Sequence, residues 1–187
     1  MPPKVKIQKE DIIQTALTLV RTQGEEAINA RAIAAALGCS TQPVFSNFAT
    51  MQELQEATLS AAYEIYLDSL KREAESGEYP KYKAFGMAYI RFAQEETALF
   101  RFLFMRDRQG EALTPAPDFA ASTQIIMEAN GICREKAELL HLEMWACVHG
   151  IATMLATSFL HLDWALISTM LTDLYQGLRS KHTQEES

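Results

Sequence analysis

Glycine and proline account for only 8 and 6 of the 187 residues, and runs of alternating β-branched residues, the usual sign of strands, are few. Alanine, leucine, methionine, glutamate and glutamine are abundant instead, and these residues favour helices. Because 48% of the residues are apolar, the chain can bury one substantial core, or a small domain and a larger one. The sequence therefore predicts an all-α protein.

Cysteine is also scarce. Cys39, Cys133 and Cys147 are odd in number and lack the spacing of a metal site. A disulfide scaffold is therefore excluded, and free thiols in a reducing cytoplasm are expected. Two interpretations of Cys39 stay open, a small buried residue or a thiol whose oxidation switches binding.

The chain lacks an uninterrupted apolar span of about 20 residues, which a membrane helix needs. Its most apolar region, residues 139–171, is interrupted by three histidines and two acidic residues. The N-terminus carries lysines but no apolar core of signal-peptide length. We therefore expect no membrane segment and a cytoplasmic protein.

Positive charge is in deficit, since 17 Lys and Arg face 24 Asp and Glu and the formal net charge is −7. This balance argues against non-specific nucleic-acid binding over the whole surface. Up to residue 48, however, five cations slightly outnumber four acids, so the acidity lies in the remainder. The two halves of the chain are thus predicted to differ in function, and a local basic face fits the first.

Catalytic signatures are missing as well. The sequence contains no Gly-x-Ser-x-Gly elbow, phosphate-cradling glycine loop, His-Glu-x-x-His helix or paired Cys-x-x-Cys ligands. We therefore expect neither an enzyme nor a bound cofactor.

What is present is a pair of short helices between Asn29 and Phe48, hinged at Gly38. Asn29 is a typical cap for the first helix, and Ser40 for the second, with Pro43 in the first turn of that second helix. Val44 and Phe48 are predicted to point inward. This leaves an outward row of short polar side chains, suited to base edges and phosphates in a major groove, namely Thr41, Gln42, Ser46 and Asn47.

This segment resembles the N-terminal signature of the TetR family of one-component transcriptional repressors, as do residues 11–24 before it and residues 48–54 after it. The resemblance implies a three-helix helix-turn-helix domain that binds DNA. Two residues depart from the signature. Phe45 stands where a phosphate-contacting tyrosine is usual, and Met51 stands where a lysine is common, so each change removes a phosphate contact.

The predicted DNA-contacting set combines the outward row with nearby cations. Lys4 and Lys6 precede the first helix and suit phosphates, although a solvated tail explains them equally well. Arg31 resembles a family position that reaches DNA, and a surface salt bridge is the alternative. The full set is Lys4, Lys6, Arg31, Thr41, Gln42, Pro43, Phe45, Ser46 and Asn47.

A long helix is predicted from Thr50 to Glu75, because Thr50 and Glu53 form a capping-box pattern. In the family, this helix joins the DNA-binding domain to the second domain. We therefore predict a helix-turn-helix domain at residues 1–49 and a helical effector-binding and dimerisation domain at residues 50–187.

The second domain resembles one TetR subfamily through Ala88–Ala93, Leu99–Phe104 and a Trp-x-x-x-His-Gly element at residues 145–150. Dense aromatic and methionine side chains are compatible with a small apolar or aromatic effector, and equally with an ordinary helical core. For His149 a satisfied core histidine is the favoured role and a ligand contact is the alternative, and its spacing from His141 does not favour zinc. The predicted effector-binding residues are Tyr66, Met87, Tyr89, Phe104, Met127, Trp145 and His149.

Two helices near the C-terminus, predicted from about Arg134 to Phe159 and from Asp163 to Leu178, are suited to a dimeric four-helix bundle, the family's usual interface. Small residues in a row on the first would let another helix approach closely. Packing within one subunit is the alternative explanation. The predicted interface residues are Ala146, Gly150, Thr153, Thr157, Trp164, Ile167, Leu171 and Leu174.

Together these patterns predict a ligand-responsive repressor that binds a pseudo-palindromic DNA operator as a homodimer. A helical adaptor or interaction protein with a weakened DNA-binding domain is the alternative, motivated by Phe45 and Met51.

Overall fold

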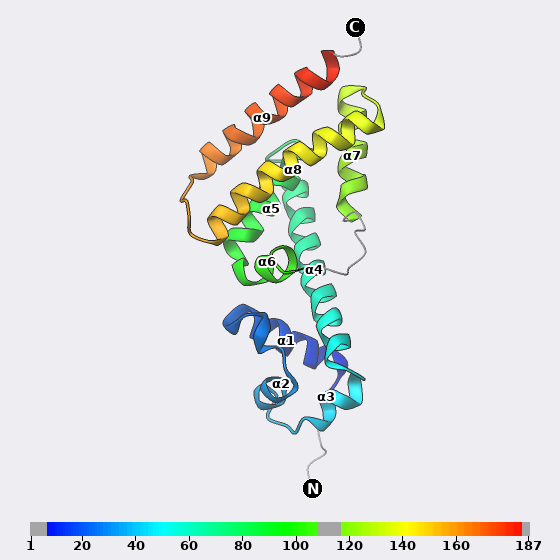
Figure 1. The fold of residues 1–187 in the computed structure, drawn as a ribbon, viewed down its shortest axis with the longest axis vertical. Coiled ribbons are helices and arrows are strands. Elements are labelled where there is room, and N and C mark those ends of the chain that lie inside the picture. The colour runs from blue at the N-terminus through cyan, green and yellow to red at the C-terminus, as the bar shows by residue number, and fades with distance from the viewer. Residues whose placement is uncertain (1–6, 108–116, 185–187) are drawn as a thin grey trace. The chain divides into compact units, whose positions relative to one another are not determined.

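The computed structural model describes residues 7–107 and 117–184 (Figure 1). Within these ranges it contains nine α-helices, one short 3-10 helix and no strand, which confirms the all-α prediction. The helices are α1 (Lys9–Gln23), η1 (Glu25–Ala27), α2 (Ala30–Ala36), α3 (Gln42–Asn47), α4 (Met51–Ser76), α5 (Lys81–Glu95), α6 (Thr97–Phe104), α7 (Pro117–Asn130), α8 (Arg134–Ala156) and α9 (Trp164–Gln184).

The chain forms two compact units. The first comprises residues 1–67 and 96–106, and the second comprises residues 68–95 and 107–187. Helix α4 therefore begins in the first unit and ends in the second, and α6 belongs to the first unit although the preceding α5 belongs to the second.

In the first unit, α1 packs against α2, α3 and α6. The guanidinium of Arg21, near the end of α1, binds both carboxylate oxygens of Glu96 just before α6, at 2.9 and 3.0 Å. The side chains at the centre of the unit are apolar and almost fully buried: Ile12, Leu17, Ile33, Val44, Phe48 and Leu54. Their removal from water is the main force holding these short helices together.

Local signals fix the ends of the first helices. The Asn29 side chain accepts a hydrogen bond from the Ala32 N–H at 2.9 Å, so the predicted cap of α2 is confirmed. After α2, Gly38 has φ +65°, a conformation that glycine adopts without strain. The Gly38 N–H donates to Ala35 O and the Cys39 N–H donates to Ala34 O, which satisfies the last carbonyls of the helix.

The predicted capping box of α4 is present in a slightly shifted form. Thr50 Oγ1 accepts from the Glu53 N–H at 3.1 Å, while the Glu53 carboxylate accepts from the Ala49 N–H at 2.8 Å. The pKa of Glu53 is lowered, mainly by the hydrogen bond from the Ala49 N–H and next by the hydrogen bond from Lys9. The helix then runs to Ser76, one residue beyond its predicted end.

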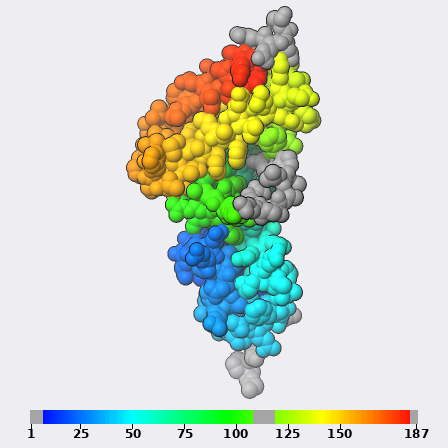
Figure 2. Space-filling view, viewed as in Figure 1, coloured from blue at the N-terminus to red at the C-terminus, as the bar shows by residue number. Residues whose placement is uncertain are grey.

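The second unit is built around α5 and α8, which pack on each other, with α7 and α9 against them. Helices α8 and α9 form an antiparallel pair, and Figure 2 shows them side by side. A Cβ at Gly86 on α5 would lie 3.4 Å from the Leu171 and Val148 side chains, so the helices approach closely there. The core side chains include Met87, Ile90, Ile126, Leu140 and Ile151.

Helix α8 ends three residues before its predicted end, at a turn without glycine. Ser158 has φ +56°, with its N–H donating to Leu155 O and the Phe159 N–H donating to Met154 O. This is the same arrangement that follows α2, with serine in the left-handed position. The apolar pattern continues past it, which is why periodicity placed the end too late.

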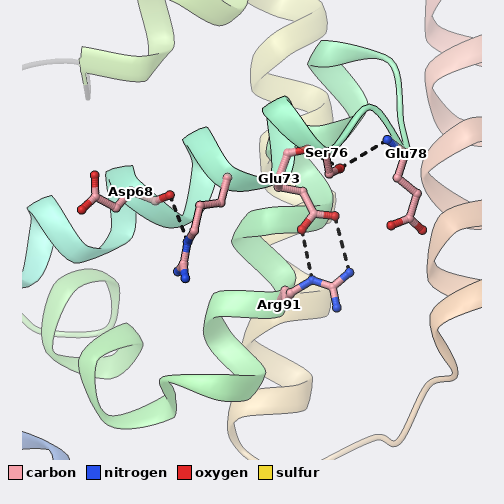
Figure 3. A network of polar contacts seen from close by, with 6 residues as sticks. Asp68, Glu73, Ser76, Glu78 and Arg91 are labelled. Atoms are coloured by element: carbon pink, nitrogen blue, oxygen red, sulfur yellow. Dashed lines mark hydrogen bonds and ion pairs between the residues drawn. The ribbon is translucent and has the colours of Figure 1, made fainter.

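The end of α4 is joined to α5 by charged groups within the second unit (Figure 3). Glu73 accepts two hydrogen bonds from the Arg91 guanidinium, at 3.2 and 3.4 Å. The same guanidinium lies 4.3 Å from the centre of the Trp164 ring at the start of α9. Ser76 Oγ accepts from the Glu78 N–H after the helix ends. Arg91 therefore holds three elements of the unit together.

The end of α9 extends six residues past its predicted end because it docks on α8. His182 is almost fully buried, and its Nε2 lies 2.8 Å from Glu143 Oε2. Lys136 Nζ donates to His182 O at 3.2 Å. The pKa of Glu143 is lowered, and the hydrogen bond from His182 is the largest of the several causes.

Among the described helices, α8 is long and apolar enough to cross a membrane by length and composition. Core helices of soluble proteins share this length and composition. Here α8 carries a buried face that packs on α5, α7 and α9.

Candidate nucleic-acid interface

Helix α3 lies over the buried centre of the first unit. Its inward residues are Val44, fully buried, and Phe48, 1% exposed, as predicted. Pro43 lies in the first turn, also as predicted, but Ser40 is not the cap. The helix begins after Thr41, whose side chain makes no capping bond. A proline early in the helix removes one N–H that would otherwise need a partner, which makes a side-chain cap less necessary.

The polar side chains of α3 do not all face outward. The Asn47 amide is half-buried and donates to Pro43 O at 2.8 Å and to Ile7 O at 3.5 Å. Ser46 is exposed, and its hydroxyl donates to Gln42 O at 2.9 Å. Gln42 is exposed, and no hydrogen bond of its side chain occurs within residues 7–107 and 117–184. Thr41 is half-buried. Gln42 is therefore the amide best placed to reach a partner outside the chain.

Phe45 is the large apolar side chain that this helix exposes. Its exposed fraction is 54%, compared with 1% for Phe48 three residues later. A phenyl group has no hydrogen-bonding atom, so it adds apolar surface beside the Gln42 amide and no polar contact.

Charge around α3 is unusually low. Residues 27–52 contain no acidic residue and a single cation, Arg31, which is exposed in the first turn of α2. Lys9 is exposed and contacts its own unit, with Nζ 3.1 Å from Glu53 and 4.6 Å from the centre of the Phe48 ring. Lys4 and Lys6 lie outside the described residues. No acidic residue therefore lies within the α2–α3 segment itself, which removes a source of repulsion for a polyanion.

Three of the predicted effector-binding residues meet in the second unit. Tyr89 Oη and His149 Nδ1 are 2.9 Å apart, and the His149 ring stacks on the Trp145 indole with centroids 5.0 Å apart and planes 8° apart. Burial lowers the pKa of His149, so its imidazole is neutral at pH 7. Trp145 keeps 44% of its surface exposed. The trio thus offers an exposed indole face backed by a neutral imidazole.

The remaining predicted effector residues lie elsewhere. Met87 is fully buried and Met127 is half-buried in the second unit. Tyr66 and Phe104 belong to the first unit, where their rings meet edge to face with centroids 5.1 Å apart. The predicted set is therefore divided between the two units.

The sequence interpretation missed a second Tyr–His pair. Tyr82 Oη lies 2.9 Å from His141 Nδ1, and Phe119 of α7 packs edge-on against the same imidazole at 4.7 Å. The signal was present, because the tyrosines on α5 are seven residues apart and the histidines on α8 are eight apart. Each spacing is about two helical turns, which places both pairs on the faces where α5 and α8 meet.

The predicted dimer-interface residues differ in exposure. Ala146 and Thr157 are exposed, and Gly150, Thr153, Trp164 and Leu174 are half-buried. Ile167 and Leu171 are buried inside the subunit, with 0% and 2% of their surface exposed, so they are not presented to a second copy. Large apolar side chains that α8 and α9 do expose are Leu139, Leu142, Trp145 and Leu166.

No group of three or more histidine, cysteine or acidic side chains suited to a metal occurs within the described parts of the chain. Cys39 is half-buried in the turn between α2 and α3.

Comparison with known proteins supplies the family. No curated protein sequence matches the chain. Residues 82–174 match the family model of the tetracyclin repressor-like C-terminal domain, a span that runs from the start of α5 to about the middle of α9. The protein is therefore a TetR-family regulator, and residues 82–174 form its tetracycline repressor-like C-terminal domain.

Proposed function

We propose that this protein is a ligand-responsive transcriptional repressor whose α3 helix binds the major groove of a DNA operator. The observation that carries the proposal is the surface of α3, where Gln42 and Phe45 are exposed on a segment free of acidic residues. A glutamine amide is suited to bidentate hydrogen bonds with adenine. Arg31, with Lys4 and Lys6, supplies phosphate contacts that fix the orientation of the helix without reading sequence.

The proposed active form is a homodimer that binds a pseudo-palindromic operator. A single six-residue helix reads too few base pairs for a specific site, and a twofold dimer doubles the number. Helices α8 and α9 are proposed to form the interface, because they expose Leu139, Leu142 and Leu166 beside the small residues Ala146 and Gly150. Burying these side chains between two copies would remove apolar surface from water.

The proposed effector site is the Tyr89–His149–Trp145 cluster of the second unit. A small apolar or aromatic molecule fits the exposed indole, and the neutral imidazole offers it a hydrogen-bonding group. Helix α4 would transmit its binding, since that helix begins in the DNA-binding unit and ends in the effector unit. Such a switch requires the effector to bind the two states of the dimer with different affinities.

We place the protein in the cytoplasm and assign it no catalytic activity. Domains of this family regulate transcription and are not generally enzymes. The alternative function is a helical adaptor with a weakened DNA-binding domain. Phe45, Met51 and the inward Asn47 favour that alternative, because each removes a polar group from the DNA-facing surface.

Selection from a pool of random duplexes tests the proposal. Purified protein is mixed with the pool at about 150 mM salt, and bound duplexes are sequenced over successive rounds. The proposal predicts enrichment of one inverted repeat, and light scattering of the complex should give two chains per duplex. Enrichment of no motif over several rounds would contradict the proposal and favour the adaptor function.

A further inference from the structure

We propose that Phe45 is a sequence-reading residue that recognises the 5-methyl group of thymine in the operator. This inference rests on the proposed function and identifies the base chemistry that α3 reads. It follows from which side chains of α3 are exposed, from their spacing and from the low charge around them.

The first step is the loss of polar groups from the α3 surface. Asn47 is committed to Pro43 O and Ile7 O, and the Ser46 hydroxyl donates to Gln42 O. The two longest exposed side chains of the helix are therefore Gln42 and Phe45. At 54%, Phe45 exposes a larger fraction than Met105, the other exposed large apolar side chain among the described residues of the first unit, at 40%.

The second step is spacing. Gln42 and Phe45 are three residues apart, so they lie next to each other on one face of the helix, with Cβ atoms about 5–6 Å apart. In the major groove, adenine presents the N6 and N7 atoms that pair with a glutamine amide, and thymine presents a methyl group that pairs with an apolar side chain. An adjacent amide and phenyl therefore match an A·T base pair, or two neighbouring ones.

The third step is charge. Arg31 is the single cation of residues 27–52, and Lys9 is engaged with Glu53 and the Phe48 ring. Phosphate contacts supply much of the affinity in most protein–DNA complexes. With few available here, apolar burial at the bases takes a larger share. A phenyl in contact with a methyl is the contact of this kind that α3 can make.

Replacement of thymine by deoxyuridine tests the proposal, because it removes the methyl group and keeps every base-pairing atom. Duplexes carrying the selected operator are made with deoxyuridine at one thymine position of each half-site in turn. Loss of one buried methyl predicts about fourfold weaker binding per half-site, or roughly 15-fold for a dimer, at one or two positions.

The Phe45→Ala variant supplies the decisive comparison. It should bind the unmodified operator more weakly and lose its sensitivity to deoxyuridine at those same positions. Gln42→Ala is the matched control, since it should lose its preference for adenine and keep its sensitivity to deoxyuridine. Phe45 is exposed, so thermal melting should show that Phe45→Ala folds like the wild type.

Three outcomes are distinguishable. If no operator is enriched, the proposed function itself fails. If the wild type binds an operator specifically but tolerates deoxyuridine at every position, Phe45 does not read thymine. If deoxyuridine weakens binding equally in the wild type and in Phe45→Ala, another residue contacts the methyl group, and the proposal is overturned.

Discussion

The two units use their polar side chains in opposite ways. On α3 of the first unit, Gln42 and Phe45 extend into solvent and do little for the fold. In the second unit, Tyr82 and Tyr89 turn inward and bind His141 and His149 across the contact between α5 and α8. The first arrangement suits recognition of another molecule by a preformed surface. The Tyr–His bonds hold α5 and α8 against each other, so a ligand that breaks one of these bonds would change how the two helices pack.

The sharpest contrast is between two phenylalanines on the same short segment. Phe48→Ala should lower the free energy of unfolding of the first unit by about 3–5 kcal/mol, because the ring is 1% exposed and leaves a cavity. Phe45→Ala should change it by less than about 0.5 kcal/mol, as at other surface positions. Urea denaturation measures both. Similar losses in the two variants would show that Phe45 belongs to the core.

The recognition role of the exposed amide predicts the next largest effect. Gln42→Ala should reduce discrimination between the operator and single-base variants by about 1–3 kcal/mol at one position of each half-site. Gln52→Ala is the matched control, since this exposed amide donates to Glu56 on α4 and should not alter discrimination. Unchanged base preference in Gln42→Ala, measured by competition binding, would remove Gln42 from the base-reading set.

The inward-facing bonds of the second unit can be broken singly. Tyr89→Phe and Tyr82→Phe should each lower the free energy of unfolding by about 1–2 kcal/mol, because each leaves a histidine nitrogen without its phenol partner. Only Tyr89→Phe should also change the affinity of an effector. Calorimetric melting and ligand titration measure the two effects. Equal effects of both variants on the ligand would place the effector elsewhere.

Acid should weaken the second unit through His149. Burial lowers the pKa of this imidazole in the folded state below its ordinary value of about 6.5, so the unfolded chain binds protons first. The stability that depends on neutral His149 is therefore complete above about pH 6.5. It is lost as the pH falls from there through the lowered folded pKa. His149→Gln should flatten this part of the stability profile between pH 5 and 7, and an unchanged slope would assign it to another group.

The smallest expected effects come from the two helix ends that share one backbone geometry. Ser158→Gly should raise the free energy of unfolding by about 0.5–1 kcal/mol, because glycine adopts φ +56° without strain. Gly38→Ala should lower it by about 1 kcal/mol for the reverse reason, since its φ is +65°. Differential scanning calorimetry resolves both changes. A destabilised Ser158→Gly would mean that the serine side chain makes a contact worth more than the strain.

These turns also show how much of the fold can be predicted from the sequence. The helix ends at Asn29, Gly38 and Thr50 are set by contacts with residues only a few positions away. The helices from α1 to α4 could therefore be predicted almost to their ends. Ser158 adopts a left-handed conformation that glycine favours, so its residue type does not predict the turn.

Long-range contacts set the rest. The docking of α6 in the first unit depends on its packing against α1 and on the Arg21–Glu96 pair, which spans 75 positions. The second hydrogen bond of the Asn47 amide, to Ile7 O at 3.5 Å, spans 40 positions. Periodicity along one helix contains no information about either partner. For the same reason, the sequence placed Ile167 and Leu171 at a dimer surface, although the subunit itself buries them.

The claim on which the whole account depends is that the exposed surface of α3 binds a DNA duplex in a sequence-dependent way. Fluorescence anisotropy at about 150 mM salt compares the affinity of the protein for the selected inverted repeat with its affinity for a scrambled duplex of equal composition. The account predicts a preference of about 1,000-fold or more, as for other sequence-specific DNA-binding proteins. Equal affinity for the two duplexes would contradict it.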